Sequence, residues 1–293
     1  MNTRNQTCKR PSGDRKTRNR AFRVCGLALC LSACGCRTTY TTLVQDRDTL
    51  TQIAPFLFLL SGNYDGTCTV ERFRAAGNLG IGTFQGLDGE AVLLDGTVYQ
   101  ITGDGAVSLP GDTHLMPFGA CTLFDEEERM TLRHVASFEQ FRSLLEARFR
   151  DKPVFYAIRA HGAFDFIRVR SCDKQQKPYP PLAEATRYQH EYTYRNTRGT
   201  LVGFWTPPFV PGSIGVPGFH LHFLSDDRSQ GGHVLDFAAP RLALALDATP
   251  RITIDFSMPI ENPLLAHDIE RLVHESEKGR TPQKTESAPP VKP

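Results

Sequence analysis

The amino-acid sequence predicts an α/β (α+β) protein of two halves, in which strands and helices come first and strands alone follow. Three observations support this fold class. A helical pattern follows a capping box at residues 137–140, and the segment 173–181 is polar and rich in proline. Closely spaced strand patterns then occupy the residues beyond that segment, as in a sandwich or a closed barrel.

Length and composition bound the class of protein further. The 293 residues suffice for one large domain or two modest ones, and 40% hydrophobic with 23% charged residues is typical of a globular chain. A formal net charge of +2 gives no reason to expect a nucleic-acid partner. Beyond the N-terminus, no apolar run reaches the roughly 18 to 20 residues that indicate a membrane span.

The N-terminus has the pattern of an export signal. Many basic residues precede a short apolar stretch, residues 24–33, that ends just before Cys34. This pattern resembles a bacterial lipoprotein signal, and an ordinary secretory signal is the alternative. We therefore expect residues 1–33 to be removed, residues 34–50 to act as a tether, and the exported protein to touch a membrane only through a lipid on Cys34.

The eight cysteines do not form a recognisable metal-binding pattern. Those at 8, 25 and 30 fall in the signal, and Cys34 is the expected anchor. The others are far apart and include no C-x-x-C pair, which argues against a thiolate metal site. Export permits disulfides, but the sequence assigns no pairing among the four remaining cysteines, which are Cys36, Cys68, Cys121 and Cys172.

In the first half, local patterns predict short elements. An apolar run covers 56–60, and 69–76 is typical of a short helix or turn. Residues 91–94 and 98–101 are strand-like, and Asp95-Gly96 between them predicts a hairpin.

Residues 137–149 predict an amphipathic helix with its apolar face toward the core. Ser137 and Gln140 have capping-box spacing. The apolar face repeats at helical intervals: Phe138, Phe141, Leu145 and Phe149. Residues 154–158 and 164–169 then predict two strands around His161-Gly162.

The second half predicts strands separated by turns, and the composition from Lys278 onward predicts a disordered tail, residues 278–293. The predicted strands are 191–194, 200–205, 219–224, 233–237, 242–246 and 251–256.

Three of the nine histidines lie within the stretch GVPGFHLHFLSDDRSQGGH. Successive side chains of a strand point to opposite faces, so His220 and His222 share a face opposite the apolar residues beside them. The polar turn that ends in Gly231-Gly232 would bring His233 back to the same face. Ordinary polar residues on a solvated sheet are the alternative, but three converging imidazoles suit zinc, and also manganese, nickel or cobalt.

Several longer motifs resemble the alpha-acetolactate decarboxylase family. They run in order from about Phe56 to Phe256 and comprise GNLGIGTFQGLDGE, KPYPPL, GTLVGFWTP, VPGFHLHF and GGHVLDF. The resemblance implies two lobes: a mixed sheet with flanking helices over residues 51–178, and a small closed β-barrel that carries the metal over 179–260. It also implies that 2-acetolactate is converted to acetoin and carbon dioxide, a step of acetoin biosynthesis.

The resemblance also implies a set of site residues. His220, His222 and His233 would bind Zn²⁺, while Glu90 and Arg170 would face the same site. A C-terminal segment, residues 261–277, would contribute a second glutamate. The candidates for it are Glu270, Glu275 and Glu277, of which we favour Glu275. A homodimer is one assembly that the sequence leaves open.

The decarboxylation of 2-acetolactate is consistent with this set of residues. Loss of carbon dioxide from 2-acetolactate leaves an electron pair that becomes an enediolate, and a His-bound divalent cation would act as a Lewis acid toward its charge. Arg170 would stabilise negative charge, and the carboxylates would bind metal or transfer protons. Taken alone, Glu90 and Arg170 could equally be surface residues. The alternatives are a non-catalytic, exported zinc-binding lipoprotein and a His-triad dioxygenase.

Overall fold

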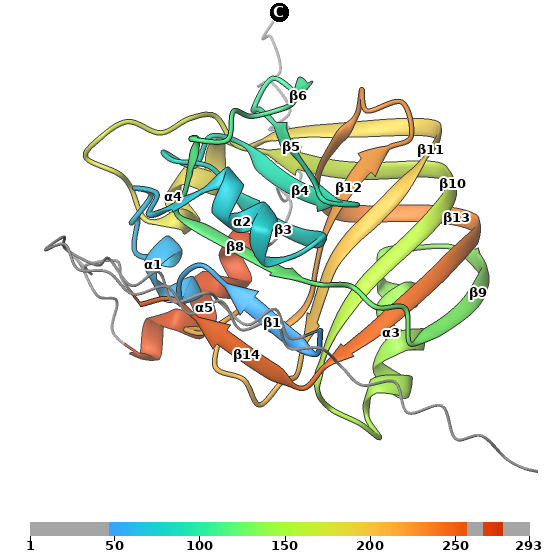
Figure 1. Ribbon diagram of the computed structural model, residues 1–293. Coiled ribbons are helices and arrows are strands. Elements are labelled where there is room, and N and C mark those ends of the chain that lie inside the picture. The colour runs from blue at the N-terminus through green and yellow to red at the C-terminus, as the bar shows by residue number, and fades with distance from the viewer. Residues whose placement is uncertain (1–46, 257–265, 278–293) are drawn as a thin grey trace, which may run out of the picture. The chain divides into compact units, whose positions relative to one another are not determined.

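A computed structural model describes residues 47–256 and 266–277, all of which belong to one compact unit, residues 43–293. This unit is mostly sheet, with few helices, so the α+β class is confirmed (Figure 1). The expected signal, Cys34 and the tail from residue 278 lie outside the described residues. Within the described ranges, none of the helices has the length and apolar character needed to cross a membrane.

The first sheet has seven strands in the order β14-β1-β8-β3-β4-β5-β6. The first and last strands of the described chain, β1 and β14, pair in parallel, and the other pairs are antiparallel, so the mixed sheet is confirmed. The predicted hairpin is the pair β4 and β5. The strands are β1 (Thr49–Gln52), β3 (Leu79–Thr83), β4 (Glu90–Leu94), β5 (Thr97–Ile101), β6 (Val107–Ser108), β8 (Phe118–Thr122) and β14 (Arg251–Ile254).

The second sheet has five strands in the order β10-β11-β12-β13-β9. An additional pairing of β10 with β13 makes the first four strands a ring, and the small closed barrel stays a prediction. The strands are β9 (Glu128–Val135), β10 (Phe155–Ser171), β11 (His190–Thr206), β12 (Gly218–Ser225) and β13 (Gly231–Thr249). A separate ribbon pairs β2 (Cys68–Thr69) with β7 (Leu115–Met116).

Three of these strands are longer than the sequence patterns predicted. The predicted strands 154–158 and 164–169 are parts of the continuous β10, and the same holds for the predicted pairs within β11 and β13. Gly162 does not interrupt β10, because its backbone is in register with Gly199 on one side and Leu242 on the other. Pairing on both edges holds the strand through a residue that weakens an isolated strand.

The two sheets pack face to face. Val92 and Leu94 on β4 lie in one apolar cluster with Val202 of β11 and Leu224 of β12. Strands β9 and β10 precede residue 178 and pair with the later strands of the second sheet, and the two lobes divided at residue 178 stay a prediction.

The helices pack on the faces of the two sheets that point away from the shared interface. Helix α2 (Val70–Ala76) packs on this face of the first sheet, and α3 (Phe138–Phe149) packs against the apolar face inside the ring of strands (Figure 1). At its start, Ser137 Oγ accepts a hydrogen bond from the Gln140 N–H at 3.1 Å, as predicted. A third group packs in one apolar cluster: α1 (Phe56–Leu60), α4 (Leu182–Ala185), which continues as a 3₁₀ turn over Thr186–Tyr188, and α5 (Ala266–Glu277).

Candidate active site

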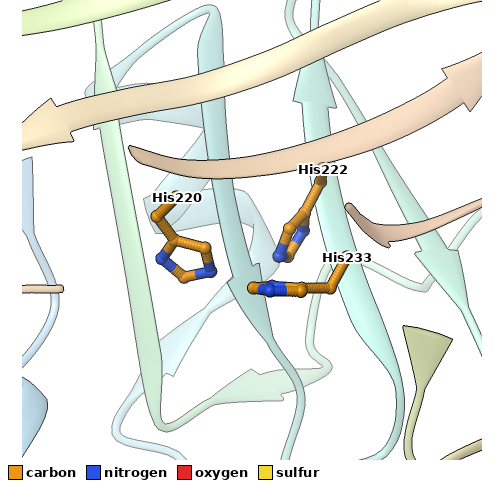
Figure 2. Close-up of side chains that lie close together, drawn as sticks. All are labelled: His220, His222 and His233. Atoms are coloured by element: carbon orange, nitrogen blue, oxygen red, sulfur yellow. The ribbon is translucent and has the colours of Figure 1, made fainter. Parts of the chain in front are cut away.

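Three imidazole rings meet where the two sheets face each other, as the strand alternation predicted. Figure 2 shows His220 and His222 from β12 directed toward His233 of β13. One nitrogen from each ring lies within 4.8 Å of the others. The residues between them along β12, including Leu221, belong to the opposite, apolar face inside the ring of strands. Three converging imidazole nitrogens can hold a metal ion.

Register explains why these side chains converge. Across β12 and β13, His222 lies directly opposite His233, and across β13 and β10, His233 lies directly opposite Arg170. Directly opposed residues of antiparallel strands project to the same face, so one row of the sheet carries all three. A register shift between Arg168 and Val169 sets this row, because it displaces the β10–β13 pairing just before Arg170.

The imidazoles are held neutral. Burial, with the nearby Arg170, lowers the pKa of His222 to about 3. Burial is also the main cause that lowers the pKa of His220 and His233 well below the ordinary value. The Nδ1 of His222 lies 2.9 Å from the Ala91 carbonyl oxygen of β4 and donates to it in the neutral ring. Its Nε2 is then a lone-pair acceptor, and this buried atom has no hydrogen-bond partner among the described residues. A neutral imidazole oriented in this way is the form that binds a metal.

Arg170 is buried, with 5% of its surface exposed. Its Nη2 lies 3.9 Å from Glu277 Oε1, and its Nη1 lies 3.9 Å from the Cys172 sulfur. The Nε atom has no partner within the described part of the chain. A guanidinium stays protonated at any ordinary pH, so this group is a buried positive charge with hydrogen-bonding capacity left for an anion.

Glu90 reaches the site from the first sheet. Glu90 is the first residue of β4 and lies on the same face of the strand as Val92, which packs against the second sheet. The Oε2 atom of Glu90 lies 3.4 Å from His222 Nε2. Gly89 before it has a φ of +76°, and a Cβ at this position would collide with the Ile101 carbonyl oxygen, so only glycine fits this approach. Burial raises the pKa of Glu90 to about 7 against the opposing effect of Arg170.

The C-terminal glutamate in the site is Glu277, and the expectation for Glu275 was wrong. Glu277 Oε2 lies 3.5 Å from His233 Nε2, whereas Glu275 is exposed and accepts a hydrogen bond from Arg271 at 2.9 Å. Helix phase is the reason, because two residues correspond to about 200° around a helix. The buried face of α5 includes Val273, one turn before Glu277. The side chain of Glu270 lies outside the described residues.

Burial also raises the pKa of Glu277 to about 7, although Arg170 opposes this shift. Burial therefore favours the protonated form of both carboxyl groups of the site, and each group can donate or accept a proton. Neutral imidazoles, a fixed positive charge and two carboxyl groups of raised pKa thus share one small volume.

One side of the site is an apolar wall that the sequence analysis did not identify. The cavity at the histidines has a volume of about 30 Å³, and apolar side chains line it together with the polar groups. The apolar side chains are Phe56, Leu59, Leu87, Phe118 and Leu182. Cys172 also lines this cavity as a buried thiol whose pKa burial raises to about 12. No spacing along the chain links these residues, because they come from α1, α4, β8 and loops.

Comparisons of the sequence with known proteins find one family. The sequence model of the family described as alpha-acetolactate decarboxylase matches residues 50–269. An alpha-acetolactate decarboxylase of Methanosarcina mazei is 40% identical over 202 residues, covering 69% of this chain and 70% of that protein. That of Brevibacillus brevis is 34% identical over 238 residues, covering 80% of this chain and 82% of that protein.

A solved structure resembles the whole described fold. The crystal structure of alpha-acetolactate decarboxylase from Bacillus subtilis superimposes with a TM-score of 0.73 at 29% identity. The match covers 79% of this chain and 100% of that one. The similarity therefore includes both sheets and is not limited to the histidine motif.

Proposed function

Since the chain belongs to the alpha-acetolactate decarboxylase family, we propose that it converts 2-acetolactate to acetoin and carbon dioxide. The observation that carries this proposal is the meeting of His220, His222 and His233 with Arg170 and two carboxyl groups in one buried cavity. Each of these groups has a role in the decarboxylation of a hydroxy keto acid.

The residues present fit a divalent metal, which we propose is zinc. The imidazoles are neutral, their nitrogens lie within 4.8 Å of one another, and the buried Nε2 of His222 has no partner among the described residues. An all-imidazole donor set with further positions open is suited to a catalytic Zn²⁺. When bound, the ion would supply Lewis-acid stabilisation of negative charge on the substrate oxygens.

Arg170 binds the anionic part of the substrate. Its guanidinium, without a partner at Nε within the described ranges, can donate hydrogen bonds to the carboxylate of 2-acetolactate. When the bond between the carboxylate carbon and C2 breaks, carbon dioxide leaves and its bonding electron pair stays with the organic fragment. The negative charge then lies on oxygens near the same guanidinium, which stabilises the product side of this step.

Glu90 and Glu277 control the proton. Acetoin forms when C2 of the enediolate takes up one proton, so the site must hold an acid at neutral pH. Burial raises the pKa of both carboxyl groups, which favours their protonated form. Glu277 lies beside both Arg170 and His233, so we assign the proton donor role to its carboxyl group.

The apolar wall keeps water away from this chemistry. Phe56, Leu59 and Leu182 line the same cavity as the polar groups. Excluding water strengthens each electrostatic contact inside the site.

The experiment that tests the activity is detection of acetoin from 2-acetolactate with and without a chelator. We expect the chelator to remove activity and zinc to restore it. His222→Ala should lower both activity and bound zinc, measured by elemental analysis of the purified protein. Protein that retains zinc but forms no acetoin would favour a non-catalytic zinc-binding protein and would reject the decarboxylase.

We also propose that the protein is exported and anchored to a membrane through a lipid on Cys34. The basic residues, the short apolar stretch and the cysteine that follows it support this proposal. Cell fractionation tests it, because Cys34→Ser should move the protein out of the membrane fraction. A Cys34→Ser protein that stays in the membrane fraction would reject the anchor.

A further inference from the structure

A second, larger cavity adjoins the histidine site. Its volume is about 670 Å³, and it lies between α3, the segment 208–217 and α5. It shares two lining residues, His233 and Glu277, with the cavity of about 30 Å³ at the histidines. The small cavity has room for about one water molecule, whereas 2-acetolactate is several times larger. The larger cavity is therefore the space through which a molecule of that size can approach His233 and Glu277.

Arg142 contributes a cationic side chain to the lining of this cavity. It lies on α3, lines the cavity with Phe138, and has its guanidinium 6.0 Å from the centre of the Phe138 ring. Its ion pairs are long: Nη1 lies 3.5 Å from Glu139 and Nη2 lies 3.9 Å from Glu146. Its Nε is buried and has no hydrogen-bond partner in the described part of the chain.

Among the described residues that line this cavity, Arg142 carries the only fixed positive charge. His274 lies on the exposed side of α5, and Glu277 and His233 stand at the inner end, beside Arg170. A negatively charged substrate would thus meet Arg142 first and Arg170 last. Opposite charge along such a path raises the local concentration of substrate and its association rate.

We propose that the cavity between α3 and α5 is the access route of the substrate, and that Arg142 binds its carboxylate before it reaches Arg170. This inference rests on the proposed function, since it assumes an anionic keto acid as substrate. Arg142 is a substrate-recruiting residue, so its removal changes how efficiently substrate is captured and leaves the reacting groups in place.

The test compares Arg142→Gln with Arg148→Gln in the zinc-loaded protein. Arg148 is a matched control, because it lies on the same helix, is exposed to a similar degree, pairs with Glu128 and does not line the cavity. We expect Arg142→Gln to raise KM for 2-acetolactate about 3- to 10-fold with kcat nearly unchanged, and to flatten the salt dependence of kcat/KM. Arg142→Lys should recover most of the wild-type KM, and Arg148→Gln should behave as wild type.

Two results would overturn the inference: an Arg142→Gln protein with wild-type KM and salt dependence, or an equal change in Arg148→Gln. A wild-type protein without turnover would reject the proposed function instead. In that case, calorimetry with 2,3-dihydroxy-2-methylbutanoate, the unreactive reduced analogue of acetolactate, still decides the role of Arg142. An increased Kd in Arg142→Gln alone would uphold the role, and an unchanged Kd would overturn it.

Discussion

Replacement of Glu277 by glutamine removes the proposed proton donor while keeping the size of the side chain. The carboxyl group lies 3.5 Å from His233 and 3.9 Å from Arg170, and burial raises its pKa, which favours the protonated form that a proton donor needs. An amide has no such proton to give. General acid–base catalysis contributes about 10²- to 10⁴-fold to a rate, or about 3 to 5 kcal/mol of barrier. We therefore expect Glu277→Gln to lower kcat at least about 100-fold.

Glu275→Gln is the matched control on the same helix. Glu275 is exposed and pairs with Arg271 at 2.9 Å, and an exposed pair four residues apart contributes about 0.3 to 0.5 kcal/mol to stability. Its loss should leave kcat within about twofold of wild type. Both variants are assayed for acetoin under saturating 2-acetolactate and zinc, with circular dichroism as the check on folding.

The comparison of these two variants tests which face of α5 points into the site. If Glu275→Gln lost activity and Glu277→Gln kept it, the helix would present the other glutamate to the site and the argument from its buried face would fail. If folded, zinc-loaded Glu277→Gln kept full kcat, the proton would have to come from elsewhere, and the assignment of Glu277 as donor would be rejected.

Three further predictions concern stability and the positioning of the site. Burial raises the pKa of Asp247 to about 7, so folding favours its protonated form; this contribution is fully present below pH about 4 and is lost as the pH rises through 7. Asp247→Asn stays neutral at every pH. From pH 5 to pH 8, its free energy of unfolding in urea should therefore rise by about 1 kcal/mol relative to that of wild type, because solvent screening reduces the effect of the full shift. An equal difference between the two proteins at both pH values would contradict this reasoning. Gly89→Ala should lower both the melting temperature and kcat, because a Cβ there collides with Ile101 beside Glu90, and a variant with wild-type kcat would show that this turn does not position the glutamate. Ser137→Ala should reduce the free energy of unfolding by about 1 kcal/mol through loss of the cap on Gln140, with kcat unchanged, and denaturant titration with a parallel acetoin assay checks both parts.

Local patterns predicted the histidine site because the relevant interactions are local. Alternation along a strand placed His220 and His222 on one face, and a turn of a few residues returned the chain to His233. The same holds for the hairpin at Asp95-Gly96 and for the capped helix from Ser137. In each case the sequence period or the turn chemistry acts between residues that are close together in the chain.

Contacts between distant segments decided the rest. The continuity of β10 through Gly162 depends on partners on both edges, which no local pattern contains. The choice of Glu277 over Glu275 depends on which face of α5 packs in the core, and a helix can be rotated without any change in its sequence.

The sequence by itself determined which chemical groups are present and which of them share a strand face, because side-chain direction in a strand follows from the backbone. Only the tertiary structure decided how far Glu90, Arg170 and Glu277 lie from the histidines, and that Arg142 borders a cavity leading to them. These relations join residues far apart in the chain, and they exist only once the two sheets and α5 have packed together.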